Sequence, residues 1–287
     1  MRWSDRRKKL RAVMEGGRCV HPASVWDPMS ARVAEDLGHD VGILAGSVAS
    51  LMVLGAPDVV VMTLSDMAEQ CKRVCRATEM PLLVDADHGF GNALSVMRTI
   101  EDHEIAGVSA LSIEDTVLPV EFAQKESVKL TSMEEGLGKM QAAVEARRDP
   151  DFLIAARTSA PVAAGIDETI RRITAYQETG VDALFVVGLK TMDEIKAVSD
   201  AAKLPMIISY PGDDVVDLDA LSETKARICL QPHLAVQAAL KATRDTMVAL
   251  QSGVPSAEIA ASSVDKQLSA EATRKADYDD WAKRFLG

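Results

Sequence analysis

The sequence predicts a (β/α)₈ barrel of the TIM type with C-terminal helices. Short apolar runs alternate with stretches of 3.6-residue periodicity, and continuous apolar runs are typical of parallel strands covered on both faces. The length of 287 residues suits one such barrel. Because no linker interrupts the pattern before about Gln251, we expect 1–287 to be a single barrel domain. The polar tail over about 252–287 is expected to be helical and to pack on the barrel or on a neighbouring subunit, since Tyr278, Trp281 and Phe285 share one helical face.

Nine apolar runs compete for the eight strands of the barrel. They lie at 18–24, 41–45, 59–62, 81–85, 110–113, 152–157, 183–187, 206–209 and 227–230. The run at 59–62 is expected to be a loop segment. The helical patterns cover 28–37, 65–77, 93–103, 132–146, 166–179 and 192–202.

Residues that favour helix ends mark several of these boundaries. Ser65 and Thr191 precede helical patterns and are expected to act as N-caps. Gly38, Gly107 and Gly180 follow helical patterns, where a left-handed C-cap favours glycine.

Charge and composition exclude several kinds of partner. With 32 basic and 43 acidic residues the net charge is −11, which argues against nucleic acid, since phosphate binding needs clustered positive charge. No apolar run approaches the length of a membrane span, and no apolar signal core follows the basic N-terminus. Cys71 and Cys75 could ligate a metal from one helical turn, but their surroundings indicate a buried helix face. Four reduced thiols favour the cytoplasm.

Acidic side chains follow the predicted strands at the mouth of the barrel, where active sites of this fold lie. Asp85 and Asp87 end one strand and point to the same side, and Glu114 ends the next. Three carboxylates so close together would repel one another without a cation, and oxygen ligands suit Mg²⁺. We therefore predict a metal site from Asp85, Asp87 and Glu114. The alternative is that Asp85 caps a helix and Glu114 pairs with a lysine.

Other polar residues follow the remaining strands. Arg157 ends an apolar run and needs an anionic partner, either a substrate carboxylate or Glu114. Gly46 and Ser47 offer backbone N–H groups and a hydroxyl suited to an oxyanion, although a simple turn would look the same. His233, with Tyr210 nearby in the mouth, competes with His88 as the acid–base group, and His88 could instead orient a carboxylate. The histidines that fall away from the mouth receive no role: His21, His39 and His103.

The segment VDADHGFGN at 84–92, followed by IED at 113–115, resembles the isocitrate lyase/phosphoenolpyruvate mutase superfamily. The resemblance runs from about Cys19 to Gln251. It implies a barrel with Mg²⁺ at the mouth (or Mn²⁺), a 2-keto or 2-hydroxy acid substrate, and reactions through a pyruvate enolate. It also implies a terminal helix swapped between subunits and a homotetramer built as a dimer of dimers.

The long segment 116–129 separates the branches of this superfamily. Lyases carry a catalytic Cys in a Lys-Lys/Arg-Cys-Gly-His loop, whereas the matching stretch here, EFAQKES at 121–127, has neither Cys nor His. The gating motif of the mutase and phosphonopyruvate hydrolase branch is also missing. Residues 46–50 and 85–94, with Tyr210 and His233, are similar to the oxaloacetate decarboxylase family instead. That resemblance implies substrate or metal roles for Ser47, Asp85, Arg157 and His233, although Pro232 before the histidine departs from the pattern.

The expected reaction is therefore Mg²⁺-dependent decarboxylation of oxaloacetate to pyruvate and CO₂. In it His233, Tyr210 and Arg157 act in catalysis, and Ser47 and Gly46 help to hold the substrate. Other C–C or P–C lyase chemistry of the superfamily is the nearest alternative. A catalytically silent dicarboxylate-binding barrel is a second, and a Schiff-base aldolase using Lys190 is a third.

Overall fold

The structure is a computed structural model that describes residues 3–124, 128–263 and 265–287. Contacts between Cα atoms divide the chain into two compact units, Met1–Pro232 and His233–Gly287. The expected tail over about 252–287 falls inside the second unit.

Eight parallel strands form one curled sheet in the first unit, in the order in which they occur along the chain. They are β1 (Ala23–Ser24), β2 (Gly42–Leu44), β3 (Leu82–Asp85), β4 (Ala110–Glu114), β5 (Leu153–Thr158), β6 (Ala183–Val186), β7 (Met206–Ile208) and β8 (Ala226–Cys229). A parallel bridge between Val20 and Ile228 links the last strand to the segment that precedes the first. This is the predicted TIM-type fold, and 59–62 forms no strand, as expected.

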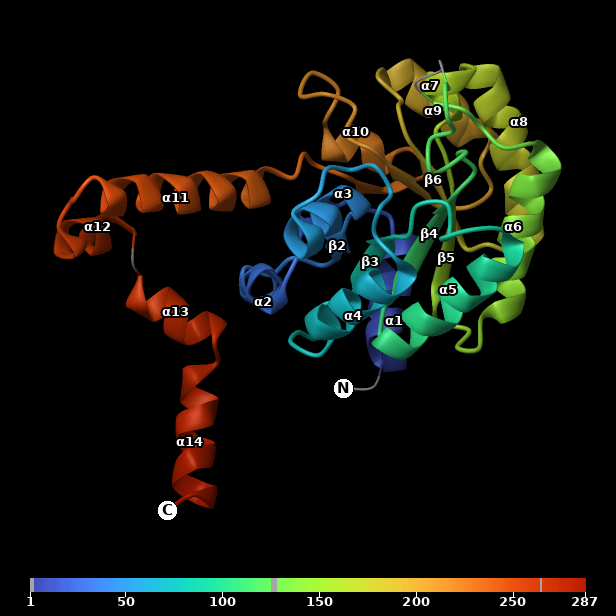
Figure 1. Cartoon of the computed structure of the whole chain (residues 1–287). Helices are drawn as coiled ribbons and strands as arrows, with labels where there is room; N and C mark the ends of the chain where they lie inside the picture. The colour runs from blue at the N-terminus through green and yellow to red at the C-terminus, as the bar shows by residue number, and fades with distance from the viewer. Residues whose placement is uncertain (1–2, 125–127, 264) are drawn as a thin grey trace. The chain divides into compact units, whose positions relative to one another are not determined.

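Helices surround these strands, as Figure 1 shows for α4, α5, α6 and α8. The helices of the first unit are α1 (Trp3–Glu15), α2 (Pro28–Asp36), α3 (Gly46–Ala49), α4 (Leu64–Cys75), α5 (Ala93–Ala106), α6 (Met133–Ala146), α7 (Ala160–Ala163), α8 (Ile166–Tyr176), α9 (Met192–Ala201) and α10 (Leu218–Ser222). The π-helix η1 (Ser50–Leu54) and the 3₁₀ helix η2 (Gln177–Thr179) extend α3 and α8.

The helix ends follow the expected chemistry with one exception. Thr191 caps α9 through a capping box with Glu194, and Gly38, Gly107 and Gly180 adopt positive φ as predicted. Ser65 is not an N-cap, and that prediction was wrong. Thr63 accepts a hydrogen bond from the amide of Asp66 instead, so α4 begins one residue before Ser65. A threonine two residues upstream is an equally good capping residue, and spacing alone did not separate the two.

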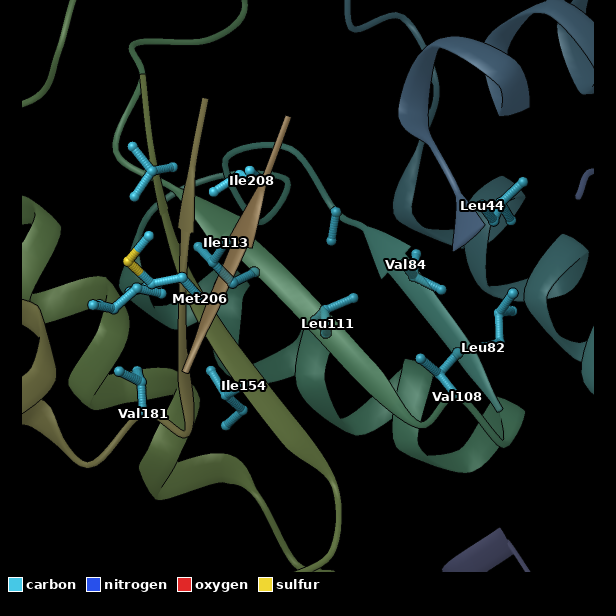
Figure 2. Close-up of a cluster of buried hydrophobic side chains, with 14 of the residues drawn as sticks. Leu44, Leu82, Val84, Val108, Leu111, Ile113, Ile154, Val181, Met206 and Ile208 are labelled. Atoms are coloured by element: carbon cyan, nitrogen blue, oxygen red, sulfur yellow. The ribbon is translucent and has the colours of Figure 1, made fainter. Parts of the chain in front are cut away.

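Alternate residues of each strand enter two different hydrophobic clusters. Leu82, Val84, Leu111 and Ile154 belong to the larger cluster between the strands and the helices, which Figure 2 shows in close-up. The opposite set fills the inside of the barrel and contains Leu83, Ala110, Leu153, Ala155, Ala183, Phe185, Ile207 and Ile228. Leu10 and Met14 of α1 pack against this interior set.

The second unit contains only helices: α11 (Leu234–Gln251), α12 (Ser256–Ser263), α13 (Lys266–Ala272) and α14 (Lys275–Phe285). On α14, Tyr278 and Trp281 stack edge to face, with ring centroids 5.1 Å apart. Both remain exposed, as does Phe285. Within the described parts of the chain, no helix is both long and apolar enough to cross a bilayer.

Candidate active site

The predicted charged residues lie together above the interior of the barrel. Asp85 follows Leu83 by two residues on β3, and Glu114 and Arg157 continue the inward-facing rows of β4 and β5 in the same way. Glu114 and Arg157 are register partners in adjacent strands. The Arg157 guanidinium forms an ion pair with Asp85, and its Nε lies 3.3 Å from Oε2 of Glu114. The expected pairing of Arg157 with Glu114 is thus present.

Asp87 joins this group through an unusual turn. Its φ of 47° lies in the left-handed region, which non-glycine residues occupy only when the surroundings hold them there. The amide of Asp87 donates to Oδ1 of Asp85 at 3.2 Å, and its carbonyl accepts from the amide of Glu114 at 2.8 Å. A Cβ atom on Gly46 would lie 2.8 Å from Oδ1 of Asp87, so a larger residue at the start of α3 would push the carboxylate away.

The site holds more carboxyl groups than the single guanidinium of Arg157 can pair with. Burial, followed by the neighbouring charges of Asp85 and Glu114, raises the pKa of Asp87 to about 8. Burial also raises the pKa of Glu114, although Arg157 opposes the shift. Burial disfavours the charged form of Arg157, but Asp85 and Glu114 outweigh it and raise its pKa. An additional cation would relieve this repulsion.

Sequence reasoning missed a fourth carboxylate, that of Asp58. Asp58 is exposed, yet partial desolvation raises the pKa of its carboxyl group, and the charge of Asp85 raises it further. Asp58 also contributes to the raised pKa of Asp87. Asp58 lies in the irregular segment between η1 and α4, where no strand end points to it. The Gly55-Ala-Pro-Asp58 turn was the only available signal.

The donor atoms at this mouth fit a hard divalent cation by their chemistry. Carboxylate oxygens are the ligands that Mg²⁺ prefers, usually one or two carboxylates with retained waters. Within residues 3–124, 128–263 and 265–287, no group of three or more His, Cys, Asp or Glu side chains is arranged so that it could hold a metal ion. A site with one direct carboxylate, and with the others acting through water, does not need such a group.

The other predicted residues lie in different surroundings. Ser47 is partly buried in the first turn of α3. The hydroxyl of Tyr210 donates a hydrogen bond to Asp213 in its own loop, which raises the pKa of Tyr210 to about 12. His233 precedes α11 and is the first residue of the second unit, so its part in the site stays a prediction.

His88 does not orient a carboxylate, in contrast to one of our expectations. Its Nδ1 is buried without a hydrogen-bond partner in the described structure, and its carbonyl accepts from Nζ of Lys139 at 3.1 Å. Burial and the charge of Lys139 lower the pKa of His88 to about 4. His88 is therefore a neutral packing residue at pH 7. Lys139, itself only 2% exposed, anchors the turn that carries Asp85 and Asp87.

The remaining sequence predictions concern thiols and the long loop. All four cysteines are free and buried, and Cys71 and Cys75 lie on the buried face of α4 as expected. The loop after β4 begins and ends at a bridge between Thr116 and Leu130. Lys125 and Glu126 of this loop lie outside the described residues.

Comparison with known sequences identifies the family to which this barrel belongs. The sequence model of the phosphoenolpyruvate phosphomutase family matches residues 10–251, and the chain belongs to that family. It is 48% identical, over 89% of its length and 88% of the relative's, to an oxaloacetate decarboxylase of Bradyrhizobium diazoefficiens. It is 43% identical to an oxaloacetate decarboxylase of Rhodopseudomonas palustris strain BisA53, over 100% of this chain and 99% of the relative.

Solved structures agree with this assignment. A phosphonopyruvate hydrolase in complex with oxalate and Mg²⁺ superposes with a TM-score of 0.87 and 28% identity, covering 98% of this chain and 99% of the other. The superfamily resemblance expected from the sequence is therefore confirmed.

Proposed function

We propose that this protein decarboxylates oxaloacetate to pyruvate and CO₂ with the help of a divalent metal ion. The observation that carries the proposal is the largely buried cluster of Asp85, Asp87, Glu114 and Arg157, in which three carboxyl groups share one guanidinium. The similarity over the whole chain to relatives named oxaloacetate decarboxylase selects the reaction.

In this proposal Asp85, Asp87 and Glu114 would hold the ion, with Asp85 as its principal ligand. The ion is Mg²⁺, with Mn²⁺ as its substitute. When bound, it supplies a Lewis acid toward the keto oxygen, on which negative charge develops as CO₂ leaves. The ion pair of Arg157 with Asp85 keeps both side chains at the rim of the barrel interior, where a planar guanidinium suits a substrate carboxylate.

The remaining roles concern orientation and the proton. Gly46 lies beside Asp87 and Ser47 follows it in the chain, and their backbone amides and the hydroxyl would hold the substrate's carboxylate or keto oxygen. His233 delivers the proton to C3, and Tyr210 orients the departing carboxylate. The Tyr210 hydroxyl is protonated at pH 7, and in this role its proton, donated to Asp213 in the structure, turns to the substrate carboxylate.

The nearest competing function is another C–C or P–C bond cleavage on the same scaffold. The structural neighbours include a phosphonopyruvate hydrolase, and that class also works on a 2-keto acid. The loop stretch 121–127 lacks the cysteine on which isocitrate-type cleavage depends, which favours decarboxylation.

A side-by-side assay tests the proposal. Oxaloacetate, methylisocitrate and phosphonopyruvate are each incubated with the protein in Mg²⁺, in Mn²⁺ and in a chelator, and pyruvate release is measured above the rate with metal alone. We expect turnover of oxaloacetate only, lost in chelator and in Asp85→Ala. His233→Ala should lower turnover by about 10²-fold, as expected for a general acid–base group. Near-normal decarboxylation by Asp85→Ala in chelator would rule out the proposed metal role.

We also propose that the second unit is the terminal extension of one barrel domain and serves assembly. Exposed aromatic side chains on α14 support a homotetramer in which terminal helices are exchanged between subunits. Four free, buried thiols support a reducing compartment, the cytoplasm.

A further inference from the structure

We propose that Arg172 and Asp115 form a positioning pair for the acidic site, acting on Glu114 and Arg157 from between the strands and the outer helices. The kinetic consequence rests on the proposed function, whereas the structural consequence does not. Neither residue has a role in the reaction described above, and both are almost completely buried.

The side chain of Asp115 is fixed by three donors. Its Oδ2 accepts hydrogen bonds from Nη1 of Arg172 at 2.8 Å, from the hydroxyl of Tyr176 at 2.6 Å and from Oγ1 of Thr158 at 3.0 Å. Hydrogen bonds to charged groups in a buried setting are among the stronger ones. Asp115 is therefore a fixed point behind the site.

This fixed point connects to both charged partners in the mouth. The amide of Asp115 donates to the carbonyl of Arg157 at 3.2 Å, and its side chain accepts from Thr158, the next residue. On the other side, Asp115 directly follows Glu114. Thr116 then donates to Oε2 of Glu114 at 3.1 Å. A displacement of Asp115 would therefore move Glu114 and Arg157 together.

Arg172 extends the pair to the far end of the loop after β4. Its Nη2 donates to the carbonyl of Thr131 at 2.9 Å, while the amide of Thr131 donates to the carbonyl of Asp115 at 2.8 Å. One guanidinium thus joins the residues on either side of segment 116–130. Its Nε is held by Glu168 at 2.7 Å, which orients the group. Lysine carries the same charge but cannot make this fork of contacts.

The neighbouring residue provides a matched control. Arg171 lies on the same helix and pairs with the same Glu168, through two contacts of 2.7 Å, but its side chain is 60% exposed. No contact joins it to Asp115 or Thr131 in the described structure. Arg171→Lys therefore repeats the chemical change on the other partner of Glu168, while the contacts of Arg172 with Asp115 and Thr131 stay in place.

The kinetic test compares Arg172→Lys, Tyr176→Phe and Arg171→Lys. We expect KM for oxaloacetate to rise about 10-fold or more in Arg172→Lys and several-fold in Tyr176→Phe, because small displacements of positioned groups are costly. Arg171→Lys should stay within about 2-fold of the unchanged protein. A merely structural role would lower the melting temperature and the folded fraction but leave KM of the folded enzyme unaltered. That result, or equal effects of the two arginine substitutions, would overturn the proposal.

Hydrogen exchange of the folded protein gives a readout without turnover. We expect faster amide exchange in peptides covering 113–118 and 129–133 in Arg172→Lys, and unchanged exchange in Arg171→Lys. If Arg172→Lys does not fold, Tyr176→Phe carries both tests. If the unchanged protein does not turn over oxaloacetate while the exchange difference appears, the proposed function fails and the positioning pair stands. Unchanged exchange in every variant would overturn the pair itself.

Discussion

Individual charged residues of this protein differ in how their burial is compensated. Asp115 has three donors on one oxygen, and Asp85 has Arg157, whereas Asp87 has like charges as its main neighbours. The first two carboxylates are held by the protein itself. Asp87 gains most from a cation supplied from solution, which is why the acidic mouth is interpreted as a binding site rather than as a structural ion-pair network.

The position of site residues was predictable where a strand led to them. Asp85, Glu114 and Arg157 follow apolar strands, and the two-residue alternation of the strand fixes the face on which they lie. Asp58 follows no strand, and Tyr210 turns toward Asp213 through a loop contact. Neither arrangement is encoded in periodicity, so the sequence could not reveal them.

A buried histidine makes the stability of the fold depend on pH. Burial lowers the pKa of His103 from 6.5 to about 4, so the unfolded chain binds a proton that the folded protein does not. The contribution of neutral His103 to the free energy of unfolding is fully present above pH 6.5. It is lost as the pH falls toward 4, by about 3 kcal/mol in total. Between pH 7.5 and pH 5, the free energy of unfolding measured in urea should fall less in His103→Gln than in the unchanged protein.

The exposed His39 provides the comparison. In His39→Gln, the free energy of unfolding should fall between pH 7.5 and pH 5 by as much as in the unchanged protein. An equal reduction in both variants would contradict the assignment to burial.

At the scale of elements, the turn between β3 and α5 concentrates the unusual backbone of the molecule. Asp87, Gly89, Phe90 and Gly91 all have positive φ. Thr99 of α5 donates to the carbonyl of Gly89 at 3.0 Å, and Lys139 of α6 holds the preceding carbonyl. Two helices therefore hold the turn that presents Asp85 and Asp87.

Gly38 and Gly89 have nearly the same φ but differ in the space around them. Substituting each by alanine therefore distinguishes the cost of backbone strain from the cost of steric overlap. Gly38 has φ +82° and open space where a Cβ atom would lie, whereas a Cβ on Gly89, at φ +81°, would overlap Cγ2 of Val96. Gly38→Ala should cost about 1 kcal/mol of unfolding free energy from backbone strain alone. Gly89→Ala should cost roughly 1–3 kcal/mol more from overpacking. Equal losses in urea unfolding would show that the crowding is relieved by movement.

Elements were more predictable than their ends. Every predicted helix pattern corresponds to a helix, because long amphipathic periodicity is a strong signal. The run at 18–24 shortened to the two residues of β1, with Val20 pairing separately to β8. Pairing at the closure of a barrel is decided by strand geometry around the whole ring, which a local pattern does not contain.

At the scale of the whole molecule, the proposed assembly depends on the second unit. Trp281 and Phe285 expose apolar surface on α14, and such surface is typical of contacts between chains. In Trp281→Glu with Phe285→Glu, we expect light scattering after size exclusion to report a smaller species than the tetramer proposed for the unchanged protein.

Asp280→Asn on the same helix is the control, because Asp280 pairs with Arg284 of its own helix. It should elute unchanged. A monomeric unaltered protein, or a tetramer that survives both glutamates, would contradict the proposed role of α14.

The packing of α1 against the inside of the barrel has a consequence for how substrate reaches the site. Leu10 and Met14 close one end of the barrel, and apolar side chains fill its inside. No route through the described part of the barrel therefore leads to the charged residues at the other end. A substrate must enter, and its products must leave, on the side of the charged residues. Substrate and products therefore share one opening, at the charged end of the barrel.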